Sequence, residues 1–247
     1  MRQSGNMFPP SQASPHGTIP QRRRARAAGP LAALLTLAWA VSTPGAPALT
    51  NITFVGFDTE TTGLKVKQDR VVEISAVKFL NGVIIAATNW LVNPGIEIPP
   101  EATRVHGITT EMVRDKPPIQ EVISAFLKFC GKAPLIAHNA RYDVSILQAE
   151  AHRHNFRMPT NTVFDTLALT RRWFPDSPTH RLESLAAYLS IPPVRFHRAQ
   201  TDTEVMVAVF DRGVKQMGPG ASLEDLGRLS RVTLLLGANP PRRRLHK

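Results

Sequence analysis

Runs of apolar residues predict three strands at the start of the folded part of the chain. Residues 52–58 form an apolar run that is typical of a buried strand, and residues 71–80 form a longer run rich in β-branched side chains. The dipeptide Asn81-Gly82 favours a type I′ turn, and residues 83–92 continue as a third strand. The pattern therefore predicts an antiparallel three-strand meander.

After the meander, the apolar positions change to a helical spacing. A proline-rich stretch at 94–100 predicts a loop, and we expect Thr109 or Thr110 to cap a short helix after it. Two prolines then open a helix over residues 119–130. The further expected elements are a strand at 134–137, a helix at 141–151, a strand at 163–164, helices at 165–173, 182–189 and 199–215, and a last helix that begins at a capping box of Ser222 and Asp225.

Length and composition agree with one large domain that carries appendages. The chain has 247 residues, of which 43% are hydrophobic, and these can supply a sizeable core. The net charge of +11 comes mainly from the two ends, because residues 51–241 carry 21 basic and 19 acidic side chains. The charge alone therefore does not indicate a nucleic-acid partner. The single Cys130 excludes an intrachain disulfide framework, and we expect it to be a small buried side chain.

Residues 1–50 have the composition of a disordered or signal-like segment. An arginine cluster at 22–26 precedes an apolar run at 30–41, and a small-x-small site follows it, as in a secretory signal. The apolar run is too short to span a bilayer, which takes roughly 20 residues, so we expect no transmembrane span. We expect a cytoplasmic protein, with export as the alternative if residues 22–48 act as a signal. A disordered extension, with Met7 as another start, is the other interpretation of this segment.

Two carboxylates stand one residue apart where the first strand ends. Side chains alternate across a strand, so Asp58 and Glu60 share one face if the extended geometry continues through Glu60. Neighbouring acids repel each other unless a cation lies between them, and hard divalent cations take carboxylate oxygens. The pair therefore fits half of a metal site. A solvated strand end followed by a turn is the alternative.

Two later junctions each place a histidine five residues before an aspartate. His138 precedes Asp143 and His197 precedes Asp202, and both acids fall in the first turn of an expected helix. The helix dipole favours acids there, and that alone explains either aspartate. Together with the first pair, however, they give four carboxylates, enough for a site with two divalent ions about 3.5–4 Å apart that serves phosphoryl transfer. Oxygen ligands favour Mg²⁺ or Mn²⁺, and His197 is suited to take a proton from the attacking water.

Three segments resemble the motifs of the DEDDh 3′→5′ exonucleases, the family of the proofreading (epsilon) subunit of bacterial DNA polymerase III and its stand-alone relatives. The segments are residues 57–63 (FDTETTG), 138–143 (HNARYD) and 197–202 (HRAQTD). Similar segments lie between them, at residues 71–74, 105–109, 164–167 and 182–185. The resemblance implies an α/β protein with an RNase H-like fold, in which a mixed sheet with the antiparallel meander is flanked by helices. It divides the chain into a disordered or signal-like segment at 1–50, an exonuclease domain at 51–215, and a short helix with a basic tail at 216–247.

The resemblance assigns a role to each acid and to one histidine. Asp58 is similar to the acid that bridges both metal ions, and Glu60 and Asp202 resemble ligands of the ion on the nucleophile side. Asp143 matches the acid that serves the second ion, and His197 resembles the general base. The implied cofactors are two divalent cations, Mg²⁺ or Mn²⁺.

The resemblance also implies six residues near the terminal nucleotide: Thr59, Thr61, Glu101, His106, His138 and Tyr142. The two threonines are expected to place backbone or hydroxyl groups there. Glu101 and His106 match contacts to the 3′-terminal nucleotide, and loop residues without a role are the alternative. His138 and Tyr142 resemble residues that line the nucleotide pocket, where an aromatic ring stacks on any base. Tyr142 replaces the commoner Phe. Asp165 is explained more simply as a helix N-cap, so we leave it out of the catalytic set.

The resulting hypothesis is a metal-dependent 3′→5′ exonuclease of proofreading or repair type. It would release nucleoside 5′-monophosphates from single-stranded or frayed 3′ ends of DNA. An RNA exonuclease and a catalytically silent single-strand-binding module are the alternatives. A DNA polymerase partner stays open, because the epsilon subunit docks through a C-terminal extension, whereas residues 213–247 here hold one short helix and a basic tail.

Overall fold

The computed structural model describes residues 46–192, 198–230 and 233–237, which belong to one compact unit of the chain. Most of the signal-like segment, the general-base candidate His197 and the basic tail lie outside the described residues, so the interpretations made for them stay predictions. Among the described residues, no helix is long and apolar enough to cross a membrane.

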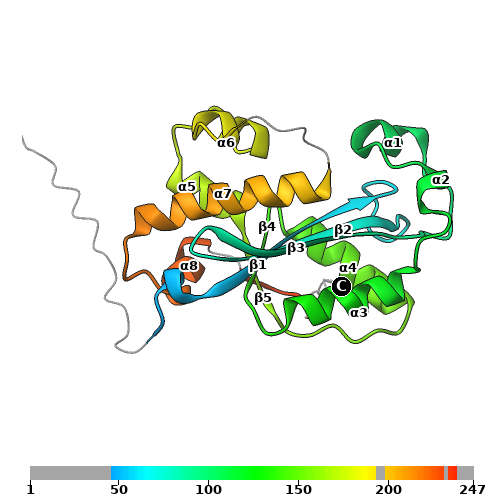
Figure 1. Cartoon of the computed structure of the whole chain (residues 1–247), viewed down its shortest axis with the longest axis horizontal. Coiled ribbons are helices and arrows are strands. Elements are labelled where there is room, and N and C mark those ends of the chain that lie inside the picture. Colours follow the sequence, from blue (N-terminus) through cyan, green and yellow to red (C-terminus); the bar gives the residue numbers. More distant parts are fainter. Residues whose placement is uncertain (1–45, 193–197, 231–232, 238–247) are drawn as a thin grey trace, which may run out of the picture. The chain divides into compact units, whose positions relative to one another are not determined.

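Six strands form one mixed sheet in the order β3-β2-β1-β4-β5-β6 (Figure 1). Antiparallel pairing joins β1 (Thr53–Thr61), β2 (Val71–Leu80) and β3 (Val83–Leu91), which confirms the predicted meander. β4 (Leu135–Ala137) pairs in parallel with β1, and β5 (Thr162–Asp165) pairs in parallel with β4. The carboxyl ends of β1, β4 and β5 therefore point the same way.

The turn between β2 and β3 has the predicted chemistry. Asn81 and Gly82 have φ angles of 49° and 74°, and two successive positive values are the mark of a type I′ turn. The register that follows pairs Asp58 with Ser75 and Glu60 with Glu73 on neighbouring strands. The second of these pairs brings two acids side by side on one face of the sheet.

The helices follow the predicted pattern with one addition. Pro100 stands at the first position of a helix, where its missing N–H is not needed. The expected proline loop therefore ends at Pro99, and α1 (Pro100–His106) begins at the next residue. Thr109 caps α2, and Ser222 and Asp225 form the expected reciprocal capping box at α8. The helices are α1 (Pro100–His106), α2 (Thr110–Val113), α3 (Ile119–Cys130), α4 (Arg141–Arg153), α5 (Thr166–Trp173), α6 (Leu182–Tyr188), α7 (Ala199–Met217) and α8 (Leu223–Ser230).

A short last strand was not predicted. β6 (Thr233–Leu235) pairs antiparallel with β5, so part of the C-terminal segment joins the sheet. Three residues are too few for a pattern of alternation, which is why the sequence gives no sign of this strand. A 3₁₀ turn at Leu49–Asn51 precedes β1.

Helices lie on both faces of the sheet (Figure 1), and an apolar cluster packs between the helices and the sheet on each face. On β1, Val55 and Phe57 belong to the cluster with α3 and α4, whereas Phe54 belongs to the cluster with α5, α6 and α7. Side chains alternate along the strand, so Asp58 and Glu60 extend from the same face as Phe54. The packing of the core therefore turns both acids toward α7.

A glycine lets α7 approach the central strand closely. A Cβ atom on Gly56 would lie 3.1 Å from the Met206 side chain and 3.3 Å from those of Thr203 and Val207. Such distances are shorter than ordinary contacts, so a larger residue here would push the helix away from β1. Because Asp202 precedes Thr203, the same close packing brings the first turn of α7 to the end of β1.

Candidate active site

Three carboxylates meet where β1 ends and α7 begins. Asp58 and Glu60 extend from β1, and Asp202 extends from the first turn of α7. Each offers an oxygen within 4.8 Å of the oxygens of the other two. The strand continues through Thr61, so the extended geometry on which the predicted pairing of Asp58 and Glu60 depended is present. The structure thus brings together residues that are about 140 positions apart in the chain.

The carboxylates destabilise each other's charged forms. Burial raises the pKa of Asp58 well above its ordinary value, and the charge of Asp143 adds to the effect. Burial also raises the pKa of Glu60 to about 8, and Glu73 and Asp202 contribute further. A divalent cation would relieve this repulsion, and three carboxylates are the hard oxygen donors that such a cation takes. The donor set therefore fits a divalent metal ion.

The fourth acid lies beside the three-carboxylate cluster. Asp143 stands in the first turn of α4, and only 3% of it is exposed. Its Oδ1 accepts hydrogen bonds from the backbone N–H of Thr59, at 3.1 Å, and from the Thr59 hydroxyl, at 2.7 Å. Burial nevertheless raises its pKa to about 7. Thr59 therefore holds Asp143 in place. The expected contact between Thr59 and a terminal nucleotide stays a prediction.

The hydroxyl of Tyr142 holds the turn after β1 by hydrogen bonds. The Tyr142 hydroxyl lies 2.7 Å from Thr61 Oγ1 and donates to the Gly63 carbonyl, also at 2.7 Å. Thr61 donates to the same carbonyl at 2.8 Å. The Tyr142 hydroxyl, which a Phe at this position would lack, thus holds the turn that follows β1.

His106 connects α1 to the same strand end. Its Nδ1 accepts from the Ile108 N–H at 3.1 Å, which leaves the Nε2 proton to reach the Thr61 carbonyl at 3.3 Å. Burial lowers the pKa of His106, which agrees with this neutral form. Glu101 lies exposed in the first turn of α1. The predicted contacts of both residues with a terminal nucleotide stay predictions.

A single carboxylate organises the turn that carries His138. Asp165 Oδ1 accepts from the N–H groups of Asn139, Ala140 and Leu167 at 3.0–3.3 Å. The predicted N-cap role of Asp165 is confirmed, and the residue also ties α4 to α5. His138 itself donates from Nε2 to the His180 carbonyl at 2.8 Å, and burial lowers its pKa.

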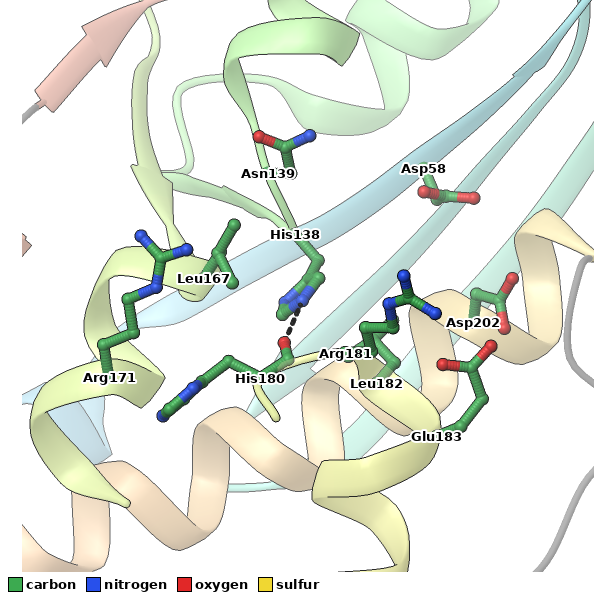
Figure 2. A pocket seen from close by; sticks show the side chains of 10 residues that line it. All are labelled: Asp58, His138, Asn139, Leu167, Arg171, His180, Arg181, Leu182, Glu183 and Asp202. Atoms are coloured by element: carbon green, nitrogen blue, oxygen red, sulfur yellow. Dashed lines mark hydrogen bonds between the residues drawn. The ribbon is translucent and has the colours of Figure 1, made fainter. Parts of the chain in front are cut away.

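An open hollow of about 590 Å³ adjoins the carboxylates (Figure 2). Asp58 and Asp202 lie at one end of it in Figure 2, Arg171 lies at the other, and His138 and Arg181 lie between them. The lining residues are Asp58, His138, Asn139, Leu167, Arg171, His180, Arg181, Leu182, Glu183 and Asp202. The hollow thus joins an acidic end that fits cations to basic side chains that fit anions.

The sequence and the fold have known relatives. A family model described as "Exonuclease" (RNase T) matches residues 55–210. This chain belongs to that exonuclease family. The match spans all three motif segments, and the predicted membership is confirmed.

Two curated relatives of this exonuclease are DNA polymerase III proteins. The DNA polymerase III subunit epsilon of Treponema pallidum is 38% identical over 162 residues, which are 65% of this chain and 75% of the relative. The DNA polymerase III PolC-type of Caldanaerobacter subterraneus is 38% identical over 164 residues, which are 66% of this chain. This chain covers 12% of the length of that PolC-type relative.

A solved structure supports the fold assignment. Exonuclease X in complex with 5′ overhanging duplex DNA matches with a TM-score of 0.59 and 27% identity, over 72% of this exonuclease and 99% of that chain. The predicted α/β fold of the RNase H-like exonucleases, with its mixed sheet and helices on both faces, is confirmed.

Several residues at the site of the exonuclease were not found by sequence reasoning. Arg171 and Arg181 line the hollow, but exposed arginines on helices and loops are too common to signal a site. Glu73 gave a better signal, because it is a charged residue within an apolar, β-branched strand. His197 lies outside the described residues, so its role as general base stays a prediction.

The raised pKa values have a consequence for the stability of the metal-free exonuclease. A carboxyl group with a higher pKa in the folded chain binds its proton more tightly when folded, so it stabilises the fold at low pH. For Glu60 this contribution is fully present below its ordinary value of 4.5 and is lost as the pH rises to about 8.

We therefore expect Glu60→Gln to stabilise the chelator-treated protein relative to the wild type at about pH 8, and to change it less at about pH 5. Thermal melting at both values, with and without Mn²⁺, measures this difference. Mn²⁺ should raise the melting temperature of the wild type and should have little effect on the variant. A Glu60→Gln protein that melts below the metal-free wild type at about pH 8 would show that the carboxylates do not repel one another.

Proposed function

We propose that this protein is a metal-dependent 3′→5′ exonuclease that releases nucleoside 5′-monophosphates from the 3′ ends of DNA. The observation that carries the proposal is the cluster of Asp58, Glu60 and Asp202, with Asp143 beside it, in a member of an exonuclease family. The epsilon subunit among its relatives and exonuclease X among the solved structures favour DNA as the substrate.

The acids would hold two divalent cations, Mg²⁺ or Mn²⁺. The charges of Asp143, Glu60 and Asp202 all act on Asp58, which by the family resemblance would serve both ions. Glu60 and Asp202 would hold the ion on the nucleophile side, and Asp143 would serve the second ion. When bound, such ions supply positive charge to the phosphate and lower the pKa of water. Thr59 keeps Asp143 oriented for this role.

The reaction is hydrolysis of the last phosphodiester bond. A water oxygen attacks the phosphorus atom, and the bond to the 3′ oxygen of the preceding nucleotide breaks. His197 takes the proton of the attacking water, and the departing 3′ oxygen is protonated by solvent. Glu60 and Asp202 would hold the ion on the side of the attacking water.

The hollow gives the strand a path away from the acids. Arg171 and Arg181 are exposed cations that line it, and they would contact the phosphates on the 5′ side of the bond that breaks. His138 lines the same hollow, beside the carboxylates. Such contacts carry no sequence information, as a nuclease that removes any terminal nucleotide requires.

The proposal extends to the location and the partner of the protein. The epsilon and PolC-type relatives favour work at replication in the cytoplasm, with a DNA polymerase as a candidate partner. Mass spectrometry of the native N-terminus distinguishes this from export, because removal of residues 1–48 would indicate a functional signal at 22–48.

We expect Asp58→Ala to lower the rate of mononucleotide release by at least about 100-fold, because a ligand of both ions is lost. The assay follows the release of labelled mononucleotide from a 3′-labelled single strand with Mg²⁺ or Mn²⁺, and a matched RNA strand separates DNA from RNA preference. Asp115→Ala, which removes an exposed aspartate, is the matched control. Unchanged release by Asp58→Ala would overturn the site assignment. Binding without release by the wild type would favour a silent single-strand-binding module.

The strand path makes a second prediction about salt. We expect Arg171→Ala and Arg181→Ala each to raise KM and to reduce the slope of log kcat/KM against log salt by about 0.7, since each removes one phosphate contact. Arg172→Ala is the control, because Arg172 is an exposed neighbour on α5 that does not line the hollow. Salt slopes that match the wild type in both variants would place the strand elsewhere.

A further inference from the structure

Glu73 is a fully buried carboxylate that the proposed chemistry does not use. It lies on β2 directly across from Glu60, on the face of the sheet that is turned toward α7, and 0% of it is exposed. Burial of a charged side chain is costly unless other groups compensate it. The contacts of Glu73 therefore indicate what this carboxylate is for.

Three groups from two other elements converge on Glu73. Its Oε1 accepts from the side-chain amide of Asn89 on β3 at 2.7 Å and from the guanidinium of Arg198 at 3.2 Å. Its Oε2 accepts from the backbone N–H of Ala199 at 3.3 Å. The carboxylate thus connects the two antiparallel strands to the start of α7.

Glu73 supplies what the start of α7 lacks. The N-cap residue Arg198 makes no side-chain capping hydrogen bond, and Ala199 is the first residue of the helix. A free N–H group and the positive end of the helix dipole favour a negative charge at this place. Glu73 provides both the acceptor and the charge from β2, 126 positions earlier in the chain.

The anchored turn is the one that carries a metal-site acid. Asp202 follows Ala199 by three residues, which corresponds to a rise of about 4.5 Å along the helix. A shift of Ala199 would move Asp202 relative to Asp58 and Glu60. The anchored Arg198 is also bonded directly to His197, the residue proposed as general base.

We propose that Glu73 and Arg198 are positioning residues that set the place of Asp202 in the metal site. The inference rests on the proposed function for its consequence in catalysis, but its geometry concerns the metal site alone. Losing the anchor loosens the first turn of α7, so the three carboxylates no longer converge within reach of one ion. Groups that orient metal ligands from behind typically contribute 10–100-fold to metal affinity.

Removal of a charge and loss of the anchor have different expected effects on cation binding. Glu73→Gln removes a negative charge near the site, so weaker cation binding is expected from either cause. Arg198→Met removes a positive charge, which by charge alone would tighten cation binding, whereas loss of the anchor would weaken it. Arg198→Met is therefore the variant that separates the two causes, and its partly exposed side chain, at 42%, makes it the milder change for folding.

Glu150→Gln is a matched control for Glu73→Gln, because Glu150 is also a buried glutamate that pairs with an arginine. It is also 0% exposed, it accepts from the backbone N–H of Val71 at 3.3 Å, and it pairs with Arg153 at 2.6 Å. It lies on α4, and no metal-site acid is among these partners. Glu150→Gln should therefore lower the melting temperature without changing metal affinity.

Two measurements on the full-length protein test the inference. Calorimetric titration with Mn²⁺, without DNA, should show affinity about 10–100-fold weaker for Glu73→Gln and Arg198→Met and unchanged for Glu150→Gln. Hydrogen exchange of the chelator-treated proteins should be faster at residues 199–203 in the first two variants only.

Mn²⁺ affinity of Arg198→Met that equals or exceeds the wild type would overturn the inference, as would unchanged exchange at 199–203. If Glu73→Gln does not fold, the result for Arg198→Met decides alone. A wild type that binds Mn²⁺ but releases no nucleotide would refute the proposed function and leave this comparison valid.

Discussion

The repulsion among the carboxylates at the end of β1 is the constraint on which the site depends. Asp58, Glu60 and Asp202 would separate in a loosely packed chain, because each raises the cost of ionising the others. Apolar packing holds them together instead: α7 lies against β1 where Gly56 has no side chain, and the aromatic cluster of Phe54 and Phe210 fixes the helix to the sheet. Burial energy in the core thus maintains an unfavourable arrangement that a cation can relieve.

Hydrogen bonds then give this arrangement its orientation. Thr59 holds Asp143, while Tyr142 and His106 both fasten the end of β1 at Thr61. Asp165 performs a similar task for the turn that carries His138. These partners are themselves buried or half-buried, so their hydrogen bonds compete little with water. The site is therefore rigid on the side of β1, β4 and α4.

The sequence predicted the features that depend on near neighbours in the chain and on ordered motifs. The meander, the Asn81-Gly82 turn and the Asp58 and Glu60 pairing follow from alternation and turn chemistry. Contacts between distant segments could not be predicted in this way. Glu73 and Ala199 are 126 positions apart, and no pattern in either segment indicates that the two residues are in contact. The helix α1 was missed because a proline that ends a loop can also begin a helix.

Glu73 shows what a buried charge at such a place contributes to the structure. Its negative charge lies across from Glu60 and raises the pKa of that ligand, so by itself it opposes the ionised site. An apolar residue would avoid this cost, but it would leave the first N–H of α7 without its acceptor. Arg198 offsets part of the charge while it pairs with the same carboxylate. The buried charge therefore lowers the electrostatic stability of the metal-free protein, and it fixes the position of Asp202.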